Sequence, residues 1–93
     1  MQSKGVLYGL VYLEPALVFL RKIQKKYRRQ IVAKINRLAS NPYPPGVKKY
    51  EGVLDGEDHV YRLRQGKYRA LYVVKDSNTI VVLDIDHRKD IYR

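Results

Sequence analysis

Arginine side chains recur at alternate positions in the second half of the sequence, in the pattern that places them on one face of a β-sheet. Arg62 and Arg64 are two residues apart, and Arg69 follows in a second segment rich in strand-forming residues. Successive side chains of a strand point to opposite faces, so residues two apart share a face. A guanidinium group is permanently charged, and its planar fork of N–H donors matches the oxygens of a phosphate. The arginines therefore predict a phosphate-binding surface, which Arg88 joins if the last strand continues that far.

The charge of the whole chain also indicates an anionic partner. The 93 residues include 19 Lys and Arg against 9 Asp and Glu, a formal net charge of +10. Residues 15–50 contain no acidic residue, so no i,i+4 attraction offsets the repulsion among their cations. A polyanion or an acidic protein that covers this surface explains a charge above the ~2 to 8 typical of small soluble domains. A merely solvated basic surface is the alternative.

Composition excludes several classes of site. The chain has no cysteine, which rules out a disulfide, a thiol nucleophile and a cysteine-based zinc site. Asp84, Asp86 and His87 could suggest a metal site, but ion pairs with the arginines explain the two acids more simply, and we expect no metal or cofactor. No apolar stretch approaches the ~20 residues that span a bilayer, and the N-terminus lacks a signal-peptide layout. We therefore expect a cytoplasmic protein.

The elements that must position the arginines follow from the spacing of apolar residues and turn formers. Residues 6–12 are rich in strand formers, and residues 13–39 carry apolar side chains at intervals of three or four, which predicts two helices. Pro15 suits a first helical turn, residues 25–29 are the expected bend, and Ser40-Asn41-Pro42 ends the second helix. We expect a long loop over residues 42–58, then strands at residues 60–64, 67–74 and 79–86.

Short turns between these last strands predict antiparallel pairing. The expected fold is α+β: a single domain over residues 1–93, with an N-terminal strand and an αα-hairpin packed on one face of a mainly antiparallel small sheet. Alternation assigns Tyr61, Leu63, Tyr68, Ala70, Tyr72 and Val74 to the helix-covered face, together with Val81, Leu83 and Ile85. The open face then receives Val60, Arg62, Arg64, Lys67, Arg69, Leu71 and Val73, and from the last strand Ile80, Val82, Asp84 and Asp86.

Three segments resemble motifs of the RelE/ParE superfamily of type II toxins. Residues 61–72, YRLRQGKYRALY, look like the YRLRxGxYRxxY strand pair of that family. Residues 87–92, HRKDIY, resemble the HRxDxY ending of its RelE branch, and residues 38–42, LASNP, resemble its helix stop. The motifs occur in the family's order and spacing over nearly the whole chain.

The resemblance implies a toxin held by an acidic cognate antitoxin in a hetero-oligomer. RelE members cleave translated mRNA on the ribosome without a metal: the 2′-hydroxyl attacks the adjacent phosphorus and leaves a 2′,3′-cyclic phosphate. By the same resemblance, Arg69 contacts the scissile phosphate, Arg88 is the terminal arginine, Tyr92 acts as general base or stacking residue, and Arg62 is the basic residue of the preceding strand. The family's lysine-bearing strand has Val60 here, so a further basic contact must come from Lys48, Lys49 or Arg64, and Lys67 joins them as an expected RNA-binding residue.

The chemistry of such a cleavage has one weak point in this sequence. Arginines suit the developing charge of the phosphorane, but the open face lacks an obvious neutral base for the 2′-hydroxyl. Surrounding cations would lower the pKa of Tyr92, and His87 is the alternative acid or base. His87 also follows the apolar parity of its strand, so a histidine at the edge of the core is the competing interpretation.

Two other functions remain open at this stage. A ParE-like inhibitor of DNA gyrase would share the fold without nuclease chemistry, and the terminal His87, Arg88 and Tyr92 favour the nuclease over it. A basic nucleic-acid-binding module that has lost catalysis is the third interpretation, because Val60 departs from the family pattern.

Overall fold

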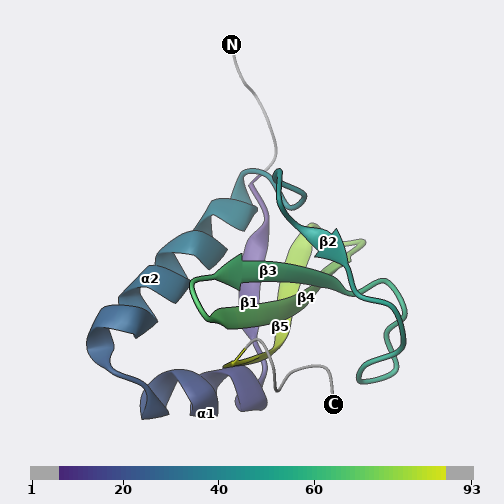
Figure 1. Cartoon of the computed structure of the whole chain (residues 1–93). Coiled ribbons are helices and arrows are strands. Elements are labelled where there is room, and N and C mark those ends of the chain that lie inside the picture. Colours follow the sequence, from purple (N-terminus) through teal and green to yellow (C-terminus); the bar gives the residue numbers. More distant parts are fainter. Residues whose placement is uncertain (1–6, 88–93) are drawn as a thin grey trace.

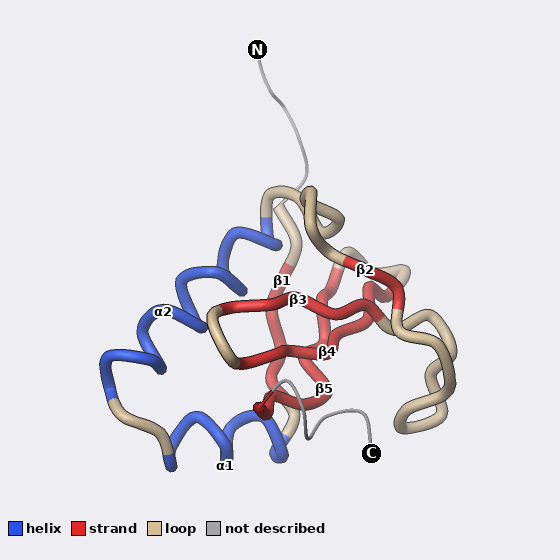
Figure 2. Tube along the Cα trace, in the orientation of Figure 1, coloured by secondary structure: helices blue, strands red, loops and turns tan. Residues whose placement is uncertain are grey.

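The fold is an α+β arrangement of two helices on one five-stranded mixed sheet, seen in a computed structural model that describes residues 7–87 (Figures 1 and 2). The elements in chain order are β1 (Gly9–Tyr12), α1 (Glu14–Lys22), α2 (Lys25–Asn36), a 3₁₀ turn η1 (Arg37–Ala39), β2 (Lys48–Lys49), β3 (Tyr61–Gln65), β4 (Tyr68–Lys75) and β5 (Thr79–His87). The strand order is β1-β5-β4-β3-β2. Only the β1–β5 pair among these strands is parallel, so the predicted fold class is confirmed.

The helical hairpin forms where the apolar spacing placed it, with a bend earlier than predicted. The chain turns at Ile23 and Gln24, and α2 already begins at Lys25. The Arg28 guanidinium donates hydrogen bonds to the carbonyl oxygens of Leu20, at 2.9 Å, and Ile23, at 3.2 Å. Carbonyls at a helix C-terminus have no partner within the helix, so this side chain both caps α1 and ties α2 to it.

The main core lies between the helices and one face of the sheet. Ala16, Leu20, Ile31, Ile35 and Leu38 of the helical segment meet Leu63, Tyr68, Ala70, Tyr72, Ile80, Val82 and Ile85 of the sheet, and all are buried. Figure 1 shows the helices and the loop that follows β2 at opposite sides of the sheet. Within the described residues, no helix is long and apolar enough to cross a membrane.

The predicted orientation of the last strand is wrong at four positions because β5 contains a bulge. Leu71 pairs with Asp84 whereas Tyr72 pairs with Val82, which leaves Leu83 as an extra residue. A bulge changes the alternation of side chains along its strand. Ile80 and Val82 therefore face the helices, and Val81 and Leu83 lie on the other side. Beyond the bulge, the predicted orientations of Asp84, Ile85 and Asp86 are correct.

The second face of the sheet is less open than predicted. Val60, Leu71, Val73 and Leu83 form a second buried cluster, against which Leu13, Tyr50, Leu54 and Val81 pack. The segment that supplies Tyr50 and Leu54 lies in the predicted long loop. This loop also contains β2, a two-residue strand that alternation could not reveal.

Candidate functional site

The pairing of β2, β3, β4 and β5 gathers charged side chains in two rows across the face that points away from the helices. The first row is Lys48, Arg62, Leu71 and Asp84, and the second is Arg64, Arg69 and Asp86. Residues directly opposite each other on antiparallel strands have Cβ atoms ~4.5–5.5 Å apart. Four cations from three strands therefore lie next to one another although they are spread over 22 positions of sequence.

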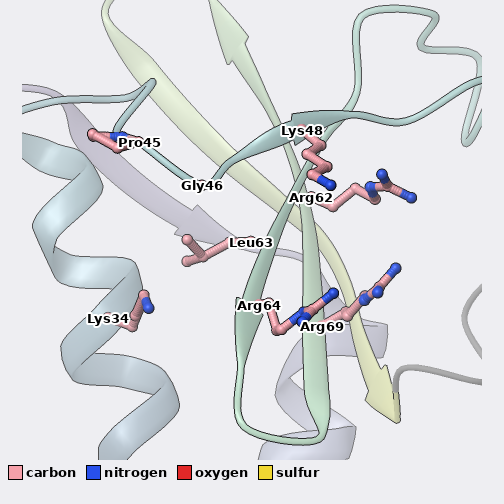
Figure 3. Close-up of a pocket in the computed structure, with 8 residues that line it drawn as sticks. All are labelled: Lys34, Pro45, Gly46, Lys48, Arg62, Leu63, Arg64 and Arg69. Carbon is pink, nitrogen blue, oxygen red and sulfur yellow. The ribbon is translucent and has the colours of Figure 1, made fainter.

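These cations line a groove of about 360 Å³ beside β3. Its walls are Lys34, Pro45, Gly46, Lys48, Arg62, Leu63, Arg64 and Arg69. Figure 3 shows Lys34 extending from α2, the other cations extending from β2, β3 and β4, and Leu63 on the side of β3 that faces α2. Five of the eight lining residues are cationic and none is acidic, so the groove attracts a polyanion.

The proline-rich rim of the groove, residues 42–46, is anchored to the core by the side chain of Tyr72. The Tyr72 hydroxyl donates a hydrogen bond of 2.5 Å to the carbonyl oxygen of Pro42, thirty residues away in sequence. Tyr72 is fully buried, and this burial raises the pKa of its hydroxyl, which stays protonated as the donor. Gly46, in this rim, has a φ of +93°, which favours glycine. The rim therefore holds a defined shape next to Lys48.

A carboxyl group at the end of the first row has an altered proton affinity. Burial raises the pKa of Asp84, and the neighbouring charges of Asp86 and Asp55 raise it further, while a hydrogen bond from the Ile85 N–H opposes the shift. Desolvation and like charges both disfavour the ionised carboxylate. Asp84 and Asp86 therefore form the acidic ends of the two rows on β5.

Two predicted site residues lie away from the groove: His87 at the end of β5, and Lys67, which was expected on the open face, in the turn between β3 and β4. The His87 ring packs against Tyr68, with ring centroids 5.1 Å apart, and against Phe19 at 6.1 Å. Lys67 places its Nζ atom 5.9 Å from the ring centroids of both Tyr27 and Tyr68. Both residues line a second cavity, between the helical hairpin and the tip of the β3–β4 hairpin. Arg69 does not line this cavity.

The remaining predictions divide as follows. Arg62, Arg64, Arg69 and Lys48 are brought together, whereas Lys49 pairs with Tyr61 and is exposed outside the groove lining. Arg88 and Tyr92 lie outside the described residues. Lys34, Pro45 and Gly46 were missed: Lys34 carries no sequence signal beyond its charge, and only the packing of α2 beside β3 brings it to the groove. Among residues 7–87, His, Asp and Glu form no group of three or more that could hold a metal ion.

Comparison with known proteins defines the class to which this fold and surface belong. Residues 10–92 match the family described as ParE toxin of type II toxin–antitoxin system, and the chain belongs to this family of RelE/ParE toxins. The helix-on-sheet fold is also that of the RelE–RelB complex of Pyrococcus horikoshii, with a TM-score of 0.74, 26% identity, and coverage of 91% of this chain and 99% of the other.

Two curated toxins are similar in sequence over part of their length. Toxin RelG of Mycobacterium tuberculosis is 50% identical over 34 residues, which cover 36% of this chain and 39% of RelG. A toxin named RelE1 of Methanocaldococcus jannaschii is 39% identical over 61 residues, which cover 63% of this chain and 66% of RelE1. The chain thus spans less than two thirds of each of these relatives.

Proposed function

We propose that this protein is the toxin of a type II toxin–antitoxin system and that it cleaves translated mRNA on the ribosome without a metal. The observation that carries the proposal is the gathering of Lys48, Arg62, Arg64 and Arg69 in one groove. The similarity to proteins named RelE and RelG favours the nuclease branch of the family.

The reaction is an attack by the RNA's own 2′-hydroxyl oxygen on the adjacent phosphorus. A bond forms between O2′ and phosphorus, the bond to O5′ breaks, and the products carry a 2′,3′-cyclic phosphate and a 5′-hydroxyl. Arg69 holds the scissile phosphate, and Arg62 and Arg64 add charge beside it. Preorganised donors of this kind stabilise the charge that develops on the phosphorane. From the family resemblance, Arg88 and Tyr92 complete the site.

The proposed partners follow from the same charge distribution. An acidic cognate antitoxin neutralises the acid-free segment 15–50 in a hetero-oligomer, and the ribosome presents the mRNA to the groove. Dependence on the ribosome is consistent with a shallow groove on a small protein, because a second body can orient the substrate. Activity in the cytoplasm follows from a translated substrate.

The test is to map mRNA ends by primer extension after induction of the wild-type protein and of Arg69→Ala. We expect cuts within translated codons, and we expect Arg69→Ala to slow single-turnover cleavage on a programmed ribosome by about 10²- to 10³-fold. Arg29→Ala is the matched control, because it removes an exposed arginine of α2 outside the groove lining. Wild-type rates in folded Arg69→Ala would contradict the proposal.

A second function is favoured by one specific observation, the match of residues 10–92 to a family described by its ParE toxin. A gyrase inhibitor of this kind would use the same surface to bind protein and would cleave no RNA. Intact mRNA together with broken supercoiled DNA after induction would support this alternative.

A further inference from the structure

Two carboxylates share the sheet face with the arginines. Asp84 and Asp86 lie on β5 on either side of Ile85, whose side chain is buried toward the helices. Their own side chains therefore face the groove side of the sheet, and both are half-buried. The reaction proposed above needs a group that accepts a proton from a 2′-hydroxyl, and carboxylates are among the groups that do this in enzymes.

Of the two carboxylates, Asp86 has the better position. It is the direct cross-strand neighbour of Arg69, whereas Leu71 separates Asp84 from Arg62 in the other row. The His87 N–H donates a hydrogen bond of 2.8 Å to Oδ1 of Asp86, which fixes the orientation of the carboxylate. That bond engages Oδ1 and does not involve the second oxygen, Oδ2. A group held in this way loses little freedom when it contacts a substrate.

We propose that Asp86 is a catalytic residue of this toxin, the general base that takes the proton of the attacking 2′-hydroxyl. The inference rests on the proposed nuclease function. A phosphate held by Arg69 has its ribose within reach of the neighbouring strand, because side chains directly opposite on antiparallel strands are in contact distance. Arg69 then receives the negative charge of the phosphorane while Asp86 receives the proton.

The proton and the electron pairs balance without a metal or an oxidant. The O2′–H bond breaks as its proton moves to Oδ2 of Asp86, and the oxygen's electron pair forms the O2′–P bond. The P–O5′ bond breaks, and O5′ takes a proton from water. The protonated Asp86 returns its proton to solvent, so the carboxylate is ready for another turnover.

The experiment compares Asp86→Asn with Asp84→Asn, a matched control on the same strand and face. Asparagine keeps the shape of the side chain and can still accept the backbone hydrogen bond, but it cannot take the proton. We expect Asp86→Asn to slow single-turnover cleavage on a programmed ribosome by about 10²- to 10⁴-fold, the usual contribution of a general base. Asp86→Glu should recover part of the rate, and Asp84→Asn should stay within a few-fold of the wild type.

Measuring the affinity for RNA distinguishes a chemical role of Asp86 from a structural or a repulsive role. The probe is an mRNA with a 2′-deoxyribose at the cleavage position, which cannot react. Its affinity for the Asp86→Asn variant should be equal to or greater than its affinity for the wild-type protein, because the substitution removes a negative charge beside the phosphate. A weakened affinity that accounts for the whole loss of rate would overturn the proposal, as would a wild-type rate in folded Asp86→Asn.

Failure of this inference is distinguishable from failure of the proposed function. If Asp86→Asn cleaves normally while Arg69→Ala does not, the groove is the active surface and only the identity of the base is wrong. If the wild-type protein leaves ribosome-bound mRNA intact, the nuclease function itself is wrong. Circular dichroism of each variant establishes whether it is folded. If Asp86→Asn fails to fold, Asp86→Glu provides a second variant for the test.

Discussion

The two faces of the sheet are built from the same strands, yet they differ in what covers them. Toward the helices, side chains such as Tyr72, Ile80 and Val82 are fully buried under α1 and α2. On the other side, the apolar residues Val73 and Leu83 are covered by a loop, and beyond Leu71 the face becomes cationic and bears the groove.

One strand can therefore serve stability and binding at once. In β4, Tyr68, Ala70 and Tyr72 are buried toward the helices, while Arg69 between them faces the groove. Since alternation separates these roles within a few residues, a substitution on one face should leave the function of the other face intact.

The largest effect is expected in the helix-side core. Ile35→Ala removes a fully buried side chain between α2 and the sheet, and a cavity of this kind lowers the free energy of unfolding by about 2–5 kcal/mol. Urea denaturation measures the change, with the exposed Asn36→Ala as control. A loss below ~1 kcal/mol would mean that this face does not carry the stability of the fold.

Next in size is the loss of one cation from the groove. Arg64→Ala should weaken binding of single-stranded RNA and reduce the slope of log affinity against log salt by about 0.7, because one phosphate contact releases fewer counterions. The free energy of unfolding should stay within about 0.5 kcal/mol of the wild type, since Arg64 is exposed. Fluorescence anisotropy at several salt concentrations measures the slope, and Arg29→Ala, outside the groove lining, should leave it nearer the wild type.

Much of this division between faces is predictable from the sequence, because alternation and turn residues are local signals. The parity of residues 60–74 places Arg62, Arg64 and Arg69 on one face, and the turn before Thr79 is marked by Asn78, which adopts a positive φ of 57°. The strands other than β2, the helical hairpin and its end before Pro42 are predictable on the same grounds.

The remainder depends on interactions distant in sequence. The bulge at Leu83 arises from the pairing of β4 with β5, so nothing within residues 79–86 signals it. Lys34 reaches the groove only because α2 packs beside β3, and the cover over Val73 depends on the path of a loop. The pairing of Asp86 with Arg69 likewise needs the register between two strands.

An intermediate effect is expected where a hydrogen bond connects the helix-side core to the rim of the groove. Tyr72→Phe keeps the buried ring but removes the hydroxyl that binds the Pro42 carbonyl oxygen. We expect the free energy of unfolding to fall by about 1 kcal/mol and cleavage to slow modestly, because the rim beside Lys48 loses its anchor. Denaturation and single-turnover rates measure both changes. Tyr43→Phe, an exposed tyrosine of the same rim, should alter neither, and equal effects of the two substitutions would count against the anchor.

The smallest effect concerns the acidic border of the cationic face. Because burial and the charges of Asp86 and Asp55 raise the pKa of Asp84, the folded state binds its proton more tightly than the unfolded state does. Ionised Asp84 therefore costs stability at pH 7, and this cost disappears as the pH falls below the unfolded-state pKa of ~3.9. Asp84→Asn should be slightly more stable than the wild type at pH 7, by less than the effect of Tyr72→Phe, and the advantage should vanish near pH 3. Urea denaturation of both proteins at the two pH values measures the difference. A variant that is less stable than the wild type at pH 7, with a deficit that disappears near pH 3, would show that Asp84 is stabilised as a carboxylate, as expected if the neighbouring arginines outweigh burial.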